Sequence, residues 1–161
     1  KGTVEENLKM AKPDATKEEM EAVLQKVNLL GFLQTQDGLQ TQLLEKASNL
    51  SGGQCQRLVI ARALLRTDSA VYIFDEAASN IDVESEELIM NVIHELAKTK
   101  TVLLISHRLA NVVKSDKIYF LKDGEIKEIG KHDELMSRNG AYRHLYESQM
   151  ALENYGKGGV A

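Results

Sequence analysis

Two short segments of the chain carry residue types that handle phosphates and metal ions. Residues 51–54 read Ser-Gly-Gly-Gln just ahead of a helical pattern, and Asp75 and Glu76 end an apolar run further along. The N–H groups and the dipole at a helix N-terminus favour anions, and glycine lets a phosphate approach the backbone closely. The first segment therefore suits a phosphate group, and the second suits a hard cation and the activation of water.

The position of the carboxylate pair, directly after the apolar run 70–74, indicates what it could do. A carboxylate at the carboxyl end of a parallel strand lies where α/β sheets bind ligands. Asp75 is predicted to hold Mg²⁺, mostly through water, and Glu76 to polarise an attacking water as a general base. An acidic turn that only caps a strand would give the same isolated pair. The residues around Asp75 and Glu76 must therefore show whether the pair is structural or functional.

The residues that must position these groups form a strand–helix–strand pattern behind a preceding helix. Apolar spacing predicts helices from Ser51 to Leu65 and from Val83 to Lys98, the second with Asp82 as its N-cap. Continuous apolar runs at 70–74 and 101–105 predict buried strands, which the intervening helix makes parallel.

Shorter elements flank this unit. Capping-box patterns at Thr3 and Thr16 predict a helix to about Met10 and another that Gly31 ends. Residues 32–49 are predicted to be loops with a short helical turn. Beyond the second strand we expect a helix at 109–114, a hairpin about Asp123-Gly124, and helices at 133–137 and 141–152.

The composition is that of an ordinary globular protein. The 161 residues are 43% hydrophobic and 27% charged, with a net charge of −4. The basic residues are spread along the chain, so no electrostatic footprint for nucleic acid is predicted. No apolar run approaches the roughly 18 to 20 residues of a membrane helix. The single cysteine, Cys55, excludes an internal disulfide and agrees with a reducing cytosol.

The wider sequence resembles the ATP-binding cassette (ABC) ATPases. Residues 50–65 read L-S-G-G-Q-C-Q-R-L-V-I-A-R-A-L-L, similar throughout to the family's signature motif and helix. Residues 71–76 resemble its Walker B strand, and 77–82, A-A-S-N-I-D, its D-loop. A serine-capped helix would explain the tetrapeptide alone but not agreement over the whole string. The resemblance implies Asp75 on Mg²⁺, Glu76 as catalytic base, and nucleotide contacts from Ser51, Gly52, Gly53, Gln54 and Asp82.

His107 follows the second predicted strand in the string I-S-H-R. A lone histidine after a strand is more often a surface or capping residue than a catalytic one. Here its position is similar to the family's H-loop. The resemblance implies that His107 is catalytic, contacts the γ-phosphate of ATP, and orients Glu76 and the water. The other histidines are assigned to helix faces or caps.

Both ends of the chain resemble exporter-type cassettes. Residues 2–7, G-T-V-E-E-N, are similar to the string after the family's Q-loop, and 130–135, G-K-H-D-E-L, to its C-terminal region. One departure lies at 41–48, which keeps Glu45 but lacks the glycines of the exporters' coupling loop. We therefore identify the chain as the C-terminal part of the nucleotide-binding domain of an exporter-type ABC transporter.

The resemblance implies an α/β fold, a truncated P-loop NTPase (ABC ATPase) with parallel β-strands and helices, a helical subdomain and a C-terminal β-hairpin. We expect a helical signature subdomain over 1–66. The C-terminal part of a RecA-like ATPase core is expected over 67–150, and a flexible tail over 151–161.

The phosphate-binding loop G-x-x-x-x-G-K-[ST] does not occur in these 161 residues. By resemblance, this Walker A loop and the Q-loop would precede Lys1. ATP and Mg²⁺ are then cofactors of the complete cassette, which is an ATPase coupled to transport. Without the loop's backbone N–H groups and lysine, the isolated segment is expected to bind ATP weakly and to hydrolyse none.

The expected partners are a second nucleotide-binding domain, identical or different, and a transmembrane domain, with no nucleic acid. The expected location is the cytoplasmic face of a membrane. Two alternatives stay open: part of a soluble ABC-type ATPase of DNA repair or chromosome maintenance, and a non-catalytic module that pairs with a complete cassette. The exporter-like opening and the lack of long heptad runs disfavour the first. The presence of Glu76 and His107 disfavours the second.

Overall fold

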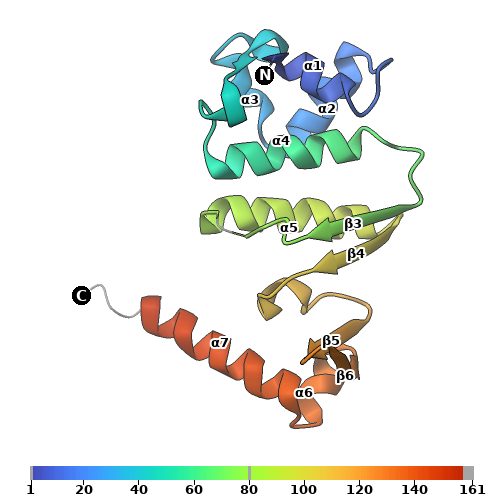
Figure 1. Cartoon of the computed structure of the whole chain (residues 1–161), viewed down its shortest axis with the longest axis vertical. Coiled ribbons are helices and arrows are strands. Elements are labelled where there is room, and N and C mark those ends of the chain that lie inside the picture. The colour runs from blue at the N-terminus through green and yellow to red at the C-terminus, as the bar shows by residue number, and fades with distance from the viewer. Residues whose placement is uncertain (1, 80, 158–161) are drawn as a thin grey trace. The chain divides into compact units, whose positions relative to one another are not determined.

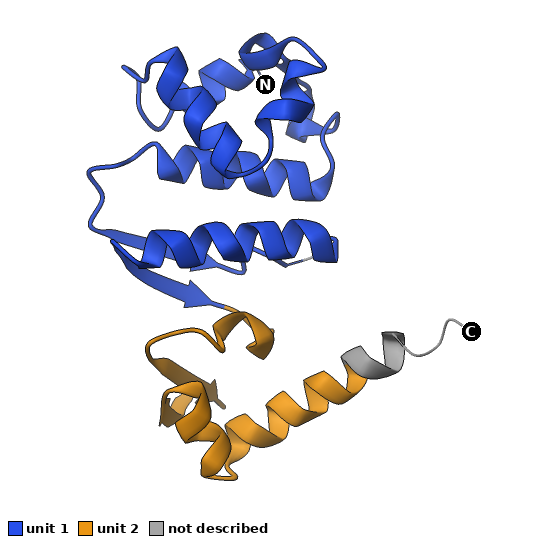
Figure 2. Ribbon diagram, turned by 180° about the vertical axis from the view of Figure 1, so that it is seen from behind, with its two compact units in different colours: residues 1–105 blue, residues 106–161 orange. Residues whose placement is uncertain are grey.

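The computed structural model describes residues 2–79 and 81–157, with side chains described up to residue 152. The chain divides into two compact units, residues 1–105 and 106–161, which Figure 2 colours separately. The predicted divisions after residues 66 and 150 stay predictions. Of the predicted tail, residues 151–157 are helical, and residues 158–161 lie outside the described residues.

The first part of unit 1 is mainly helical (Figure 1). Both predicted capping boxes are confirmed, because the N–H of Glu6 donates to Thr3 Oγ1 at 3.0 Å and that of Glu19 to Thr16 Oγ1 at 3.2 Å. Two very short strands, β1 and β2, pair antiparallel and were not predicted. The elements are β1 (Gly2–Thr3), α1 (Val4–Lys9), α2 (Lys17–Lys26), α3 (Leu30–Gln34), η1 (Gly38–Gln40), β2 (Gln42–Leu43), η2 (Glu45–Ala47) and α4 (Gly52–Leu64).

The helix predicted to run to Gly31 ends before Asn28, which adopts a left-handed φ of 51°. The N–H of Asn28 donates to the carbonyl of Gln25 at 3.0 Å, and that of Leu29 to the carbonyl of Leu24 at 2.9 Å. These are the two hydrogen bonds of a Schellman C-cap, and asparagine adopts this conformation more readily than other non-glycine residues. Gly31 therefore lies inside α3 instead of ending α2.

The predicted parallel strand–helix–strand unit is confirmed. It consists of β3 (Val71–Asp75), α5 (Val83–Ala97) and β4 (Thr101–Ile105), and its register pairs the first residues of the two strands and, at the other end, Asp75 with Ile105. In Figure 1 both strands run towards the left, and α4 and α5 begin on the left. The carboxyl ends of the strands and the amino ends of these helices therefore lie on the same side of unit 1.

The two strands are covered on one face only within the described part of unit 1. Tyr72 and Phe74 belong to the hydrophobic core together with Ile89 of α5. On the other face, Val71 is 55% exposed and Ile73 is 66% exposed. The prediction of a fully buried strand is therefore wrong for this structure, because alternate residues of a strand point to opposite faces and α5 covers one of them.

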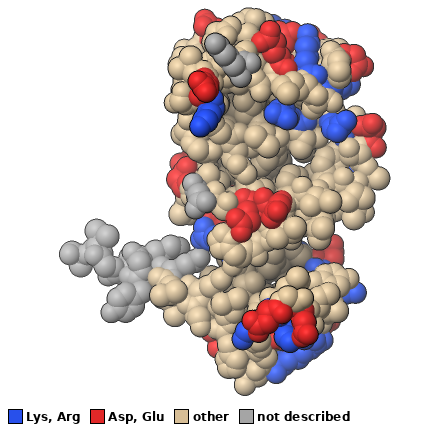
Figure 3. Space-filling view, in the orientation of Figure 1, with Lys and Arg blue, Asp and Glu red and all other residues tan. Residues whose placement is uncertain are grey.

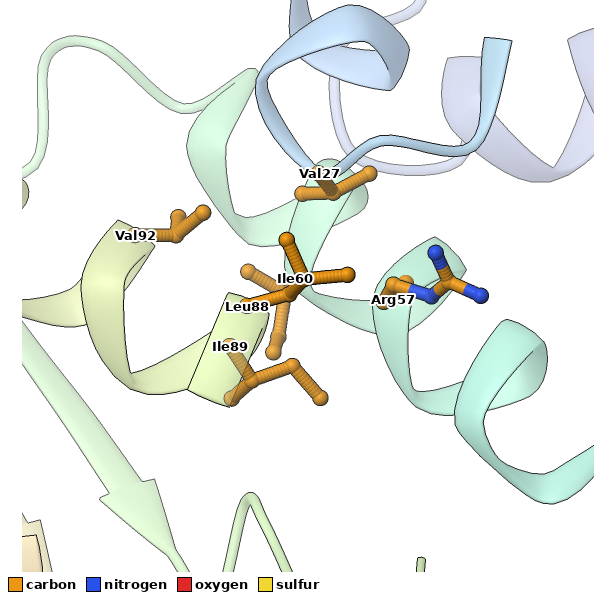
Figure 4. A pocket seen from close by; sticks show the side chains of 6 residues that line it. All are labelled: Val27, Arg57, Ile60, Leu88, Ile89 and Val92. Carbon is orange, nitrogen blue, oxygen red and sulfur yellow. The ribbon is translucent and has the colours of Figure 1, made fainter. Parts of the chain in front are cut away.

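Helices α4 and α5 pack side by side and leave a narrow gap between them (Figure 4). The gap has no room for a water molecule, so this contact is packing and not a binding site. It is lined by Val27, Arg57, Ile60, Leu88, Ile89 and Val92.

Up to residue 157, unit 2 contains a 3₁₀ turn, a β-hairpin and two α-helices. The predicted hairpin turn is confirmed, since Asp123 has φ 55° and Gly124 has φ 75°, as a two-residue type I′ turn requires. The helix predicted at 109–114 is a shorter 3₁₀ turn, and the last helix runs further than residue 152. The elements are η3 (Leu109–Val112), β5 (Ile118–Lys122), β6 (Glu125–Gly130), α6 (His132–Ser137) and α7 (Ala141–Lys157).

None of the helices in the described ranges has both the length and the apolar character needed to cross a membrane. On the face shown in Figure 3, acidic and basic side chains are interspersed. This pattern is expected for a chain with a small net charge of −4.

Candidate functional site

Helix α4 begins at the predicted phosphate-binding segment. Ser51 is its N-cap: Ser51 Oγ accepts the N–H of Gln54 at 3.2 Å, and Gln54 Oε1 accepts the N–H of Ser51 at 2.9 Å. The N–H groups of Gly52 and Gly53 lie in the first turn, where the helix itself supplies no acceptor. This turn contains no acidic residue, so no carboxylate of its own offsets the positive end of the helix dipole.

Gly53 allows the start of α4 to lie against the start of α5. A Cβ atom on Gly53 would lie 2.3 Å from Ser85 Oγ and 2.8 Å from Ser85 Cβ, so a larger residue does not fit. Asp82, the N-cap of α5, lies at the same contact, with Oδ2 3.2 Å from that Cβ position. The structure thus brings together Gly53 and Asp82, two of the predicted nucleotide-binding residues.

Hydrogen bonding keeps the Asp82 carboxylate ionised. Its Oδ1 accepts the N–H of Ser85 at 2.8 Å, and this bond lowers the pKa of Asp82 below its usual value. The guanidinium of Arg57 adds a smaller effect of the same sign. In the first turn of α5, Glu84 and Glu86 add two further acidic residues.

Arg57 was not singled out by the sequence, yet it joins two ends of helices. Its Nε donates to the carbonyl of Gly53 at 3.3 Å, and its Nη1 donates to the carbonyl of Asn28 at 2.9 Å. The first turn of α4 is therefore tied to the C-cap of α2. The available signal was the i, i+4 spacing from Gly53, which places both residues on one helix face.

Asp75 and Glu76 lie at the carboxyl end of β3, as predicted. Both residues are exposed, and Asp75 pairs with Ile105 in the parallel ladder. Glu76 turns out of the strand with φ 49°, and its N–H donates to the carbonyl of Ile105 at 2.9 Å. A left-handed conformation costs a non-glycine residue about 1 to 2 kcal/mol, and such strain clusters at functional sites.

Within residues 2–79 and 81–157, no group of three or more His, Cys, Asp and Glu side chains is arranged to enclose a metal ion. Asp75 fits a different kind of site, in which one carboxylate holds Mg²⁺ and water or phosphate oxygens complete its coordination. An anion-favouring helix end at Gly52 and a carboxylate at Asp75 lie on the same side of unit 1. Taken separately, the helix end suits a phosphate group and the carboxylate suits a magnesium ion.

His107 lies two residues beyond β4 and belongs to unit 2, whereas Glu76 belongs to unit 1. The residue is exposed, and its backbone carbonyl accepts a hydrogen bond from Gln149 Nε2 at 2.8 Å. Sequence reasoning missed Gln149, because a polar residue in an amphipathic helix gives no sign of a partner forty-two positions away.

The segment 41–48, which lacks the exporters' glycines, contains two left-handed residues. Lys46 has φ 55° and Ala47 has φ 52°. Asn49 closes the segment: its Oδ1 accepts the N–H of Leu44 at 3.0 Å, and its Nδ2 donates to the carbonyl of Gln42 at 2.9 Å. Residues 46 and 47 thus adopt a backbone conformation that favours glycine, although neither of them is glycine.

Several known proteins have sequences similar to this chain. Residues 1–79 match the sequence profile of the ABC transporter family. An uncharacterized ABC transporter ATP-binding protein of Haemophilus influenzae is 52% identical over 95% of this chain. An ATP-dependent lipid A-core flippase of Mannheimia succiniciproducens is 44% identical over 91%, and a putative multidrug export ATP-binding/permease protein of Bacillus subtilis is 40% identical over 91%.

These relatives are much longer than the chain, which spans 27%, 25% and 25% of their respective lengths. The solved structure of a bacterial Atm1-family ABC exporter with ATP bound has a TM-score of 0.83 and 30% identity, covering 92% of this chain and 26% of that one. The predicted fold class is confirmed by this similarity. The chain belongs to the ABC transporter ATP-binding family, as a segment of its nucleotide-binding domain.

Proposed function

We propose that this segment supplies the signature motif, Walker B carboxylates, D-loop and H-loop of an ATP-driven exporter. One observation carries the proposal. The amino ends of α4 and α5 and the carboxyl ends of β3 and β4 lie on one side of unit 1 (Figure 1). Helix amino ends attract phosphate and strand carboxyl ends present carboxylates, which is the combination that a magnesium-bound triphosphate needs.

The start of α4 is proposed to bind phosphate oxygens of ATP. The N–H groups of Gly52 and Gly53 donate to the phosphate, together with the hydroxyl of Ser51. Gln54 keeps Ser51 in place through the capping box. Asp82 holds the start of α5 against this turn and contributes its ionised carboxylate to the nucleotide site.

The end of β3 is proposed to carry out the chemistry. Asp75 holds Mg²⁺, which when bound neutralises charge on the phosphates. Glu76 accepts a proton from the attacking water, and its exposed position leaves it open to solvent. His107, by its resemblance to the H-loop histidine, contacts the γ-phosphate and orients the water.

The proposed partners follow from the names of the relatives, which include a flippase and export ATP-binding/permease proteins. A transmembrane domain receives the work of ATP hydrolysis. ATP is bound at the interface with a second nucleotide-binding domain, identical or different, where the signature motif of one domain faces the nucleotide held by the phosphate-binding loop of the other. The segment then acts at the cytoplasmic face of the membrane. The complete protein is an ATPase coupled to transport.

The test measures ATP turnover by the complete polypeptide that carries these residues. Replacing the general base, Glu76→Gln, should lower kcat by about 100-fold or more while ATP still binds. Glu87→Gln, which changes an exposed acid on α5, is the matched control and should keep the parent turnover. Equal turnover in the parent and Glu76→Gln proteins would contradict the proposal and favour a non-catalytic pairing module.

A further inference from the structure

We propose that Gln149 of α7 is a positioning residue for His107. Its side-chain amide holds the backbone from which the imidazole projects. The inference rests on the proposed function, because that function gives His107 its role. According to this inference, a residue of α7 also affects the rate of ATP hydrolysis.

The amide of Gln149 binds backbone groups on both sides of Arg108. Its Nε2 donates to the carbonyl of His107 at 2.8 Å, and its Oε1 accepts the N–H of Leu109 at 2.9 Å. Arg108 is extended, with φ −91° and ψ 109°, so these two groups point the same way. The primary amide of Gln149 carries a carbonyl acceptor beside an NH₂ donor. It therefore pairs with the His107 carbonyl and the Leu109 N–H as the backbone of a neighbouring strand would.

The opposite edge of the same segment is held by Ser106. Its Oγ accepts the N–H of Arg108 at 3.0 Å and donates to the carbonyl of Arg108 at 3.1 Å. Two side chains, Ser106 and Gln149, thus bind four backbone groups of residues 107–109. Residues 107 and 108 precede the 3₁₀ turn η3, which begins at Leu109, and lie in neither a helix nor a strand, so these bonds fix a backbone that no ladder holds.

Helix α7 is itself anchored close to its start. Tyr142 is fully buried, its N–H donates to Glu128 Oε1 at 2.8 Å, and its hydroxyl lies 2.8 Å from His132 Nδ1. Gln149 follows Tyr142 by seven residues, which is two helical turns, so the two side chains lie on the same face. The anchored face of α7 therefore extends to the His107 segment.

The energetics favour a role in rate over a role in stability. Leu109 is 6% exposed, so burial holds the start of η3 without help from Gln149. Each hydrogen bond of the clamp contributes only about 0.5 to 1.5 kcal/mol. A displacement of a catalytic group by about 1 Å can cost as much as 100-fold in rate. Loss of the clamp should therefore appear in kcat before it appears in folding.

The test uses the complete polypeptide and Gln149→Met, which keeps the length of the side chain and removes both hydrogen bonds. The expected result is a kcat for ATP lowered about 10-fold or more, with KM for ATP unchanged and the melting temperature lowered by a few degrees at most. Ser148→Ala is the matched control: it lies on the same helix, is exposed, and its Oγ donates to the carbonyl of His144. It should keep the parent kcat.

A double-mutant cycle distinguishes positioning from a general structural effect. In a His107→Ala background, Gln149→Met should lower kcat no further, because the group that it positions is gone. An equal further drop in that background would overturn the proposal. Unchanged kcat in Gln149→Met, with Glu76→Gln inactive, would overturn the role of Gln149 alone. Equal turnover in the parent and Glu76→Gln proteins would overturn the proposed function and this inference together.

Amide hydrogen exchange supplies a readout that needs no turnover. It decides the matter where His107→Ala hydrolyses too little ATP to measure. Gln149→Met should speed exchange at residues 107–112, because the N–H of Leu109 loses its acceptor. Ser148→Ala should leave exchange there unchanged. Unchanged exchange in Gln149→Met would overturn the clamp whatever the kinetics show.

Discussion

The α-carbon of Gly53 faces the side chain of Ser85 with no space for a methyl group between them. Gly53 belongs to the first turn of α4, and Ser85 belongs to the first turn of α5. The N–H of Ser85 also donates to the N-cap carboxylate of Asp82. The contact therefore joins the signature turn to the residue that starts the next helix. The relative position of the two helices depends on this one missing side chain.

Gly53→Ala should therefore destabilise unit 1. Glycine-to-alanine changes inside a helix normally stabilise it by up to about 1 kcal/mol. Here the new Cβ would lie 2.8 Å from Ser85 Cβ, an atom that cannot rotate away, so α4 and α5 must separate. We expect a net loss of about 1 to 3 kcal/mol, measured by chemical denaturation.

Gly31→Ala is the matched control for that change. Gly31 lies in α3 with no atom within 4 Å of its Cβ position, so alanine there should be neutral or stabilising. Adding Ser85→Gly to Gly53→Ala removes both clashing atoms and should restore part of the lost stability. A Gly53→Ala protein as stable as the parent would show that the two helices are not held this closely.

Ala47→Gly should stabilise the chain. Ala47 has φ 52°, where a side chain costs about 1 to 2 kcal/mol and glycine costs little. Glycine also makes the unfolded chain more flexible, which lowers the stability in part. The expected net increase in the free energy of unfolding is therefore up to about 1 kcal/mol. Chemical denaturation measures it.

Ala63→Gly in α4 is a control for which the opposite effect on stability is expected. Ala63 lies inside a regular helix, where glycine should cost about 1 kcal/mol. Equal losses for Ala47→Gly and Ala63→Gly would show that residue 47 is not left-handed in solution.

The stability of unit 2 should fall at alkaline pH because of Tyr142. Burial raises the pKa of Tyr142 to about 12, above its usual value near 10. The folded state thus binds the phenolic proton more tightly than the unfolded state. This contribution is complete below pH 10 and is lost as the pH rises from 10 to 12.

Tyr142→Phe tests this dependence. At pH 8 it should lose the hydrogen bond to His132 and about 1 kcal/mol of stability. At pH 11 the gap to the parent should shrink by about 1 kcal/mol, because the unfolded parent chain releases the phenolic proton of Tyr142 while the folded state still holds it. Tyr119→Phe, at a 49% exposed position, is the control and should follow the parent. A gap that stays constant from pH 8 to pH 11 would contradict the prediction.

The 161 residues alone should bind ATP weakly and hydrolyse none. They contain signature and Walker B residues but no G-x-x-x-x-G-K-[ST] loop to hold the β- and γ-phosphates. Calorimetric titration of the chain with ATP and Mg²⁺ should give little heat. Phosphate release above that of a Glu76→Gln chain would contradict this expectation.

The sequence predicted what depends on neighbours within about four residues. The caps at Thr3, Thr16 and Asp82 were readable because the donor and acceptor stand three positions apart. The Asp123-Gly124 turn was readable because its backbone conformation demands such residues. The parallel pairing of β3 with β4 followed from the helix that joins them.

What the sequence could not predict depends on distant partners. Apolar runs look alike whether one or both faces of a strand are covered, so the apolar run did not show which residues of β3, such as Ile73, are exposed. The end of α2 was misplaced because Asn28 competes with Gly31 for the same role. Gln149 lies forty residues from Leu109 along the chain, a distance at which periodicity carries no signal.

The parallel start of α4 and α5 has an electrostatic consequence. Each helix end carries about half a positive charge, and here the two ends lie on the same side of unit 1. In α5 that charge is met at once by Asp82, Glu84 and Glu86, and the Asp82 carboxylate also lies against the opening turn of α4, which has no acid of its own. The two helix ends therefore share the carboxylate of Asp82, and an anion that approaches the N–H groups of Gly52 and Gly53 also meets this negative charge.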